Sequence, residues 1–286
     1  MRDEPYFSKL IDKHAFSSQP NNGHYAVADM LLVSCIKTAI TTNVDTLIET
    51  AGEYIFGTIE AGIDGYEVAA LSPDVSPLLK IHGCRSRDWK NMIWAPGQLE
   101  VDPVKQRILN SETWLRANLL NKDILVVGFW TDWDYLNQVL AATLGAISPS
   151  RIVVVDPSDT GTFIEKAPEL FDLGDRATDI FAHVQASGSD FLDSLRRKFS
   201  QTYIRKVLYS GKDDYYADTG YEPDPGWLEP QTDDNYTLWS IRRDLEGCGP
   251  NVPATRKQPH PGETLLGLTL LKLQAGVLFR MDLTGQ

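Results

Sequence analysis

Polar side chains follow two apolar runs in the first third of the chain, and their types could do chemistry. Thr42 and Asn43 come directly after the run IKTAI, Asp45 lies two residues further on, and His82 ends the run LLKI. An amide or a carboxylate can stabilise a developing positive charge, and an imidazole titrates near neutral pH. Such residues form the floor of a ligand site or, more simply, cap helices and satisfy local backbone.

Two further apolar runs end in the same way. Gly128 follows DILVV, with Thr131 three residues later, and Asp156 ends RIVVVD. Four separate runs therefore each deliver a polar side chain or a glycine at the carboxyl end. This coincidence is the main indication from the residues themselves that the chain holds a ligand site.

The elements that must position these residues alternate between strand and helix. Near-continuous Val, Ile and Leu runs separated by helical patterns predict a Rossmann-like α/β fold, with a parallel sheet and helices on both faces. Ligands of such folds bind at the carboxyl ends of the strands. The predicted strands span 36–41, 78–83, 123–129 and 151–158, the predicted helices begin near His24 and span 44–51, 106–120 and 134–144, and 180–197 reads as strand, turn and helix.

Each candidate also has a structural interpretation. Asn43 can cap a helix that begins at Val44, and Asp45 in a first helical turn is favourable to the helix dipole. A histidine before a glycine, as at His82, is often a satisfied structural residue. His24, one turn into its helix, is expected to tether neighbouring backbone.

Composition excludes several classes of protein. The 286 residues carry a formal net charge of −12, which argues against direct binding to nucleic acid. Three distant cysteines include no CxxC pair, so neither a zinc site nor a disulfide framework is expected. No apolar run is long enough to span a bilayer, and the N-terminus lacks the apolar core of a secretion signal. We therefore expect a cytoplasmic protein without a membrane partner.

The character of the chain changes after about residue 200. We predict one domain over 1–200 and an appended C-terminal region over 201–286. The stretch 211–236 is rich in Pro, Gly, Asp and Tyr and is interpreted as a long loop. The apolar stretch 264–279 needs a partner surface to bury it, which suggests contact with another chain.

Taken in order, these pieces resemble the sirtuin family, and specifically its prokaryotic, NAD-consuming branch of anti-phage defence. TTNVDTLIETAG is similar to the family motif TQN-I-D-x-L-x-x-x-AG, with Thr42 in place of Gln. PNNGHYAVADM resembles the lead-in to that motif, and LLKIHG the strand of the catalytic histidine. DILVVGFWTDWD, RIVVVDPS and HVQASGSDF resemble the family's glycine strand, ribose strand and final strand-turn-helix. The similarity spans roughly residues 20 to 197.

The resemblance implies roles at the nicotinamide end of an NAD site. Cleavage of the nicotinamide–ribose bond passes through an oxocarbenium-like state, which a fixed carboxylate or amide oxygen stabilises. Asn43 would orient the ribose or the attacking water, and Asp45 would hold the nicotinamide amide and the ribose region. His82 would act as a general base with a pKa near the working range. Thr42 would contribute to NAD binding.

The resemblance also implies an adenosine end. Gly128 would let the backbone approach the cofactor, with Thr131 as a nearby hydroxyl. Asp156 would accept hydrogen bonds from the hydroxyls of the adenosine ribose. Ser187 and Gly188 would line the adenine.

Two family features have no counterpart in the sequence. Nothing in residues 1–35 supplies the Gly-Ala-Gly-x-Ser turn that cradles the NAD pyrophosphate. Either the chain lacks this first unit or the sequence starts downstream of it, and we expect weak NAD binding and a sheet without a central strand. The paired CxxC motifs of protein-deacylating sirtuins are also missing, with Cys84 alone in that region. This favours plain NAD cleavage without zinc.

The resulting expectation is an NAD⁺ hydrolase effector of bacterial anti-phage defence, which depletes NAD and releases nicotinamide and ADP-ribose. The family resemblance implies partners as well, either further copies of the chain or a sensor such as an argonaute-like protein or a helicase-type ATPase. A non-catalytic module that binds NAD or ADP-ribose, or that only oligomerises, is the alternative. Protein deacylation is the third possibility.

Overall fold

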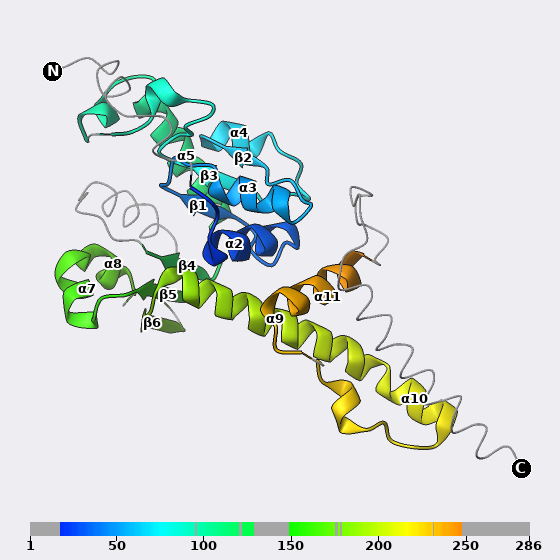
Figure 1. Ribbon diagram of the computed structural model, residues 1–286. Helices are drawn as coiled ribbons and strands as arrows, with labels where there is room; N and C mark the ends of the chain where they lie inside the picture. The colour runs from blue at the N-terminus through cyan, green and yellow to red at the C-terminus, as the bar shows by residue number, and fades with distance from the viewer. Residues whose placement is uncertain are drawn as a thin grey trace, which may run out of the picture. The chain divides into compact units, whose positions relative to one another are not determined.

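The chain divides into two compact units, Met1–Leu192 and Asp193–Gln286. A computed structural model describes residues 18–94, 96–119, 122–128, 149–174, 177, 179–230 and 232–247 (Figure 1). The boundary predicted at residue 200 falls inside helix α9 (Gly188–Ser210), which begins in the first unit and ends in the second. Within these described ranges, no helix is both long enough and apolar enough to cross a membrane.

The first unit contains a short parallel sheet built from the strands around the first two candidate motifs. Its order is β1-β3-β2, and both pairings are parallel. Thr41, the last residue of β1, is in register with Lys80, the last residue of β3. The carboxyl ends of these two strands therefore lie side by side. The strands are β1 (Ala39–Thr41), β2 (Ala61–Gly62) and β3 (Leu78–Lys80).

Helices cover both faces of this sheet. On one face, Leu79 packs against Val68 of α4 (Gly65–Ala69) and Leu115 of α5 (Val104–Asn118). On the other face, the Lys80 side chain contacts α3 (Leu47–Tyr54). Helix α2 (Asn22–Leu32) packs alongside α3. Because successive strand residues point to opposite faces, Leu79 and Lys80 bind the two helical layers in turn.

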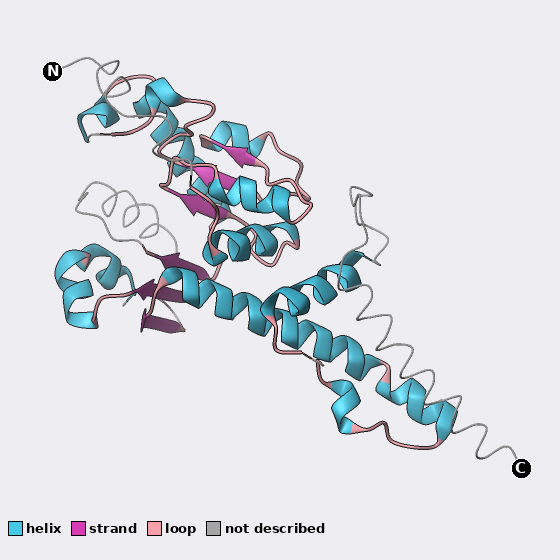
Figure 2. Ribbon diagram, in the orientation of Figure 1, coloured by secondary structure: helices cyan, strands magenta, loops and turns pink. Residues whose placement is uncertain are grey.

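A second parallel sheet, in the order β4-β5-β6, completes the first unit (Figure 2). Ile152 and Val154 of β5 pack against the helices that follow this strand, with Phe163 at the centre of that core. Val127 of β4 packs against α2 and the start of α9. The elements are β4 (Ile124–Val127), β5 (Arg151–Asp156), α7 (Thr160–Lys166), α8 (Pro168–Gly174) and β6 (Ile180–Gln185).

Parallel strands with helices on both faces confirm the predicted Rossmann-like α/β fold. The strands form two three-stranded sheets, with β1 at the end of one and β4 at the end of the other. Among the residues that the structure describes, no strand pairs with both β1 and β4. The absence of a central strand stays a prediction.

Local sequence explains where the first elements begin. Asn21 caps α2: its side chain accepts a hydrogen bond from the His24 backbone at 3.1 Å, and the His24 ring accepts one from the Asn21 backbone at 3.1 Å. This reciprocal capping box confirms that His24 tethers neighbouring backbone. Helix α3 begins at Leu47, with Thr46 as its N-cap, rather than at Val44 as predicted. Asn43 is thus not a helix cap.

The second unit is helical over its described residues. Ile204 and Leu208 of α9 pack against Leu238 and Ile241 of α11 (Asn235–Gly247). The predicted long loop at 211–236 is wrong in part, because the structure has α10 (Lys212–Thr219) and a short 3₁₀ helix, η4 (Pro225–Leu228), there.

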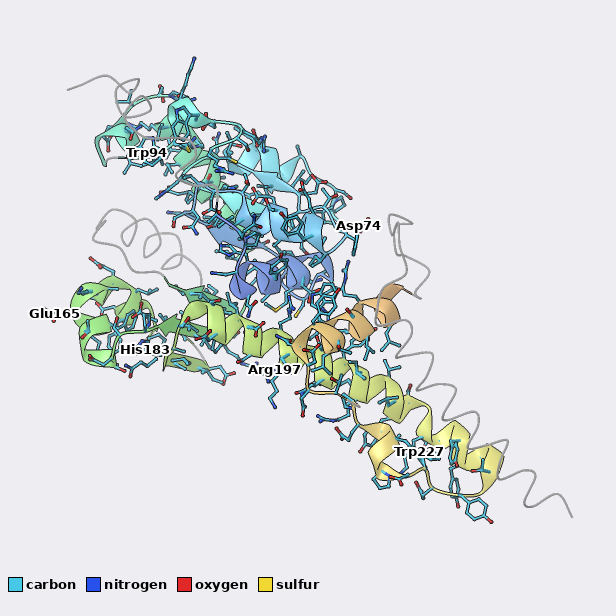
Figure 3. The ribbon with its side chains drawn as sticks, viewed as in Figure 1. Asp74, Trp94, Glu165, His183, Arg197 and Trp227 are labelled. Atoms are coloured by element: carbon cyan, nitrogen blue, oxygen red, sulfur yellow. The ribbon has the colours of Figure 1, made fainter. Side chains whose placement is uncertain are left out.

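Aromatic packing explains this difference. The ring of Tyr215 in α10 lies edge-on to that of Trp227 in η4, with centroids 6.0 Å apart (Figure 3). Gly220, with φ of 69°, ends α10 in the left-handed conformation that favours glycine. The contact between Tyr215 and Trp227 thus stabilises α10, which the polar composition of this stretch did not predict. The predicted helix 134–144 and the apolar stretch 264–279 lie outside the described residues.

Candidate functional site

Four of the candidate residues, Thr42, Asn43, Asp45 and His82, lie at the carboxyl ends of β1 and β3; we call them the histidine group. The loop after β1 and the turn after β3 are joined by two backbone hydrogen bonds. The Ile81 amide donates to the Thr41 carbonyl at 3.1 Å, and the Arg85 amide donates to the Val44 carbonyl at 2.8 Å. The structure thus brings together the two segments that carry this group.

Asn43 and Asp45 differ in how they are held. The Asn43 side chain is exposed, and within the described residues it makes no hydrogen bond; its backbone amide donates to the Thr41 hydroxyl at 3.0 Å. Asp45 is half-buried, and its Oδ1 accepts from the Leu47 amide at 3.0 Å, an Asx turn that leads into α3. Among the described residues, the Asn43 amide group and one carboxylate oxygen of Asp45 are therefore without hydrogen bonds.

His82 sits in the turn after β3, with 8% of its surface exposed. Its backbone carbonyl accepts from the Ile93 amide at 3.1 Å. Burial, together with the positive charge of Arg107, lowers the pKa of His82 to about 4. The expectation of a pKa near the working range is therefore wrong, and His82 is neutral at pH 7.

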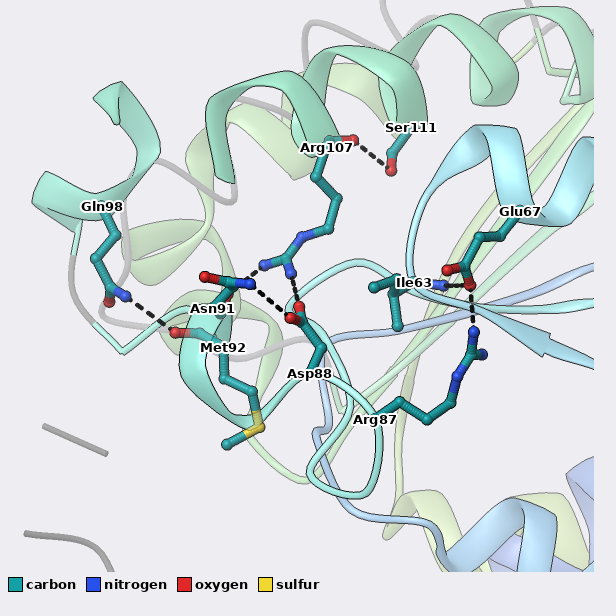
Figure 4. Close-up of polar contacts among 9 residues, drawn as sticks. All are labelled: Ile63, Glu67, Arg87, Asp88, Asn91, Met92, Gln98, Arg107 and Ser111. Carbon is teal, nitrogen blue, oxygen red and sulfur yellow. Dashed lines mark hydrogen bonds and ion pairs between the residues drawn. The ribbon is translucent and has the colours of Figure 1, made fainter. Parts of the chain in front are cut away.

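Buried polar contacts organise the loop that follows His82 (Figure 4). Arg107 of α5 pairs with Asp88 and donates to the Asn91 carbonyl at 2.8 Å. Asn91 in turn donates to Asp88 at 2.8 Å. Gly83 has φ of 93°, and a side chain there would meet the Arg107 guanidinium at 3.2 Å. The loop therefore needs both the ion pair and the glycine.

Another four candidates, Gly128, Asp156, Ser187 and Gly188, lie at the carboxyl ends of β4, β5 and β6; we call them the Asp156 group. The Gly128 amide donates to the Val155 carbonyl at 3.0 Å, which aligns the ends of β4 and β5. A Cβ on Gly188 would lie 2.6 Å from Val127 Cγ1, so only glycine lets the start of α9 approach β4 this closely.

Asp156 is the buried acid of this group, with 2% of its surface exposed. Its Oδ1 accepts hydrogen bonds from the backbone amide of Ser158, at 2.7 Å, and from the Ser158 hydroxyl. Its Oδ2 is buried without a hydrogen-bond partner among the described residues. A buried carboxylate oxygen without a donor is unfavourable, so this atom is suited to a ligand that brings a hydroxyl.

The first turn of α2 interacts with a residue beside the Asp156 group and with Asp45 of the histidine group. The Gly23 amide donates to the Ser189 hydroxyl, one residue beyond Gly188, at 3.2 Å. In the histidine group, the negative charge of Asp45 acts to raise the pKa of His24. Burial has the larger effect, and the pKa of His24 is lowered. The first turn of α2 therefore connects the start of α9 with the loop that carries Asp45.

Sequence reasoning missed Lys80, Asp88 and Arg107, which hold the segments of the histidine group in place. A signal for Lys80 was available, since a lysine inside the apolar run LLKIHG must find a partner when buried. No comparable signal marks Asp88 and Arg107, which are 19 residues apart. Thr131 lies outside the described residues. In the ranges that the structure covers, no cluster of three or more His, Cys, Asp or Glu side chains is placed to hold a metal ion.

Comparison with family models gives a match within the first unit. Residues 37–172 match the family model of the SIR2-like domain, whose members in general are NAD-dependent enzymes. The match covers the histidine group and reaches Gly128 and Asp156, while Ser187 and Gly188 lie beyond it. No curated protein matches the chain. The protein therefore contains a SIR2-like domain, that is, a sirtuin-like, NAD-related domain.

Proposed function

We propose that the protein is an NAD⁺ hydrolase that cleaves the nicotinamide–ribose bond. The observation that carries this proposal is the histidine group: a free amide, a carboxylate and a neutral imidazole at the joined ends of two parallel strands. A SIR2-like domain over the same residues supports NAD as the substrate. We further propose that the activity serves bacterial anti-phage defence in the cytoplasm, by depletion of NAD.

The side chains of the histidine group suit the charge changes of this reaction. Water and NAD⁺ give nicotinamide, ADP-ribose and one proton. As the C1′–N bond breaks, positive charge develops at C1′, which the oxygens of Asn43 and Asp45 would stabilise. His82, neutral at pH 7, would accept the proton of the attacking water or of a ribose hydroxyl.

Asp156 suits the other end of the substrate. Its unpartnered Oδ2 would accept hydrogen bonds from the hydroxyls of the adenosine ribose. The same negative charge would repel the 2′-phosphate of NADP. We therefore expect cleavage of NAD in preference to NADP, a choice that parallel assays with the two dinucleotides measure directly.

An unregulated NAD hydrolase would harm its own cell, so the activity needs a trigger. We propose that assembly supplies it, through further copies of the chain or through a sensor such as an argonaute-like protein or a helicase-type ATPase. The apolar stretch 264–279 is the candidate contact in the sequence. Assays should therefore include proteins encoded beside this one.

The decisive experiment incubates the purified protein with NAD, with and without such partners, and follows nicotinamide release by chromatography. Asn43→Ala and His82→Ala should each abolish turnover. Matched controls are Asn118→Ala, at the exposed end of α5, and His183→Gln. The His183 ring belongs to β6 and stacks on the Phe163 ring, with centroids 4.8 Å apart, and it is not one of the candidate site residues. Both controls should therefore retain activity.

The same assay separates the alternatives. Absence of nicotinamide release under every assembly condition, combined with measurable ADP-ribose binding, would overturn NAD hydrolysis in favour of a binding module. Nicotinamide release that requires an acylated peptide would indicate protein deacylation instead.

A further inference from the structure

Lys80 is the most deeply buried cation near the histidine group, with 1% of its surface exposed. It is the last residue of β3, the central strand of its sheet, two positions before His82. An ammonium group that leaves water needs strong acceptors, or it destabilises the fold. The acceptors of the Lys80 ammonium therefore show which segments this side chain joins.

The Lys80 ammonium has two acceptors, which come from different segments. One is the Glu49 carboxylate in the first turn of α3, with Nζ and Oε1 2.7 Å apart. The other is the backbone carbonyl of Asp45. Glu49 neutralises the charge, while the second contact acts on the loop that carries the Asp45 side chain.

The loop is thereby attached at three points to β3 and to the turn that follows it. Its ends are joined by the backbone bonds from Ile81 to Thr41 and from Arg85 to Val44, and the Lys80 side chain reaches the Asp45 carbonyl. The Asp45 carboxylate is oriented in turn by its bond from the Leu47 amide. Loss of the ammonium removes the hydrogen bond to the Asp45 carbonyl, in the segment that leads from Asp45 to α3.

We propose that Lys80 is a positioning residue: its ammonium, neutralised by Glu49, fixes the Asp45 loop against the turn of His82. Lys80 touches neither substrate nor reacting atoms. Its effect is to set the separation between the groups that stabilise positive charge and the group that accepts the proton. This role rests on the proposed NAD cleavage, and it extends that function to residues outside the site.

A buried ion pair that serves stability alone behaves differently. Replacement of both charged partners by apolar residues of similar volume is often neutral or stabilising, whereas loss of one partner leaves a buried charge. If the pair only stabilises the fold, Lys80→Met combined with Glu49→Leu should restore both stability and activity. If Lys80 positions the loop, the double variant should regain stability but not activity.

The experiment measures thermal unfolding, kcat and KM for NAD, and amide hydrogen exchange. For the double variant we expect an unfolding temperature within about 5 °C of wild type. We expect a kcat about 10- to 100-fold lower with KM changed by less than about threefold, since small displacements of reacting groups act chiefly on the chemical step. Amide exchange should rise within 42–46. A wild-type kcat, or unchanged exchange in that segment, would overturn the role of Lys80.

Glu49→Gln is the second test, in case the double variant does not fold. It removes the acid but leaves the ammonium on the Asp45 carbonyl. We expect a lower unfolding temperature with kcat within about threefold of wild type. A loss of kcat as large as that of Lys80→Met would mean that the ion pair, not the contact with the carbonyl, matters.

Arg87 and Glu67 form a matched control. Arg87 also joins a carboxylate to a backbone carbonyl, with 2.8 Å to Glu67 (Figure 4) and 2.8 Å to the Ala61 oxygen, but the Arg87 side chain is 47% exposed and the Glu67 side chain 38%. Arg87→Met with Glu67→Leu should leave kcat within about twofold of wild type, since exposed pairs contribute little. An equal loss of kcat there would contradict a specific role for Lys80.

Failure of the two proposals can be told apart. If the wild-type protein releases no nicotinamide, NAD hydrolysis fails, and amide exchange in the NAD-free protein still tests the Lys80 contact. If the wild-type protein is active but the double variant keeps its kcat, the function stands and the positioning role fails.

Discussion

The two candidate groups are held in opposite ways. In the histidine group, hydrogen bonds join the loop after β1 to the turn after β3. The buried cations Lys80 and Arg107 form ion pairs that hold these two segments. In the Asp156 group, backbone bonds align the strand ends, while Asp156 keeps a buried oxygen without a donor. The histidine group is thus held by contacts among neighbouring residues, whereas Asp156 has an oxygen without a donor among the described residues. Under the proposed function, this difference suits chemistry at the histidine group and substrate binding at the Asp156 group.

Asp88→Ala should have the largest effect, because it removes the carboxylate that forms an ion pair with the buried Arg107. We expect a loss of about 3 to 5 kcal/mol in the free energy of unfolding, measured by urea denaturation. The control is Glu100→Ala, which breaks an exposed pair with Lys105 at 3.6 Å and should cost less than about 1 kcal/mol. Equal losses for the two variants would contradict a special role of the buried pair in holding the loop after His82.

His82→Gln should change the pH dependence of stability. The pKa of His82 is about 4 when folded and near 6.5 when unfolded, so between these values the unfolded chain binds a proton that the folded chain does not. The free energy of unfolding therefore falls as pH drops from 6.5 to 4, by about 3 kcal/mol at the lower end. Denaturation at several pH values should show a flatter profile for the variant.

His24 is the comparison for this measurement. Burial lowers its pKa too, so it acts in the same direction, but it is less buried and Asp45 opposes the shift. His24→Gln should flatten the profile less than His82→Gln. The reverse order would show that His82 is solvated in the folded protein.

Asp156→Asn tests the proposed binding role of the Asp156 group. The amide can still accept from Ser158 through its oxygen, but it replaces the unpartnered Oδ2 with a donor. We expect the Kd for ADP-ribose to rise about tenfold, with a smaller change in kcat. Titration calorimetry provides the measurement. Asp159→Asn, an exposed cap of α7, is the control and should not change Kd. A lower kcat with unchanged Kd would assign Asp156 to the chemistry instead.

Gly128→Ala should have the smallest effect on stability. Gly128 has φ of 61°, and no described atom lies within 4 Å of an added Cβ, so the cost is backbone strain of about 1 kcal/mol. Gly220→Ala in the second unit, with φ of 69° and the same open surroundings, should cost a similar amount. If Gly128 lets the cofactor approach, only its variant should weaken ADP-ribose binding.

The strands could be predicted because their signal is local. Continuous branched apolar runs such as RIVVVD mark buried parallel strands, and the structure places β5 over these residues. Which strands pair depends on long-range contacts, so the division into two sheets was not predictable. Helices α7 and α8 were missed, because each has seven residues and they are separated by one, too short for a helical period to emerge.

Site residues at strand ends could be named, but their surroundings could not. Asp45 and His82 could be named because each is a polar residue shortly after an apolar run. The pKa of His82 depends on Arg107, 25 positions later in the chain, and on burial that no local pattern states. Lys80 and Glu49 are 31 residues apart, and only the parallel register brings them together.

The turn after β3 also carries a built-in reporter. Cys84 is 2% exposed, two residues from His82, whereas Cys35 lies exposed ahead of β1. A thiol reagent should modify Cys35 promptly and reach Cys84 only when this turn opens. Peptide mass spectrometry can monitor the two reactions, and the delay between them measures how often the turn after β3 opens in the native protein.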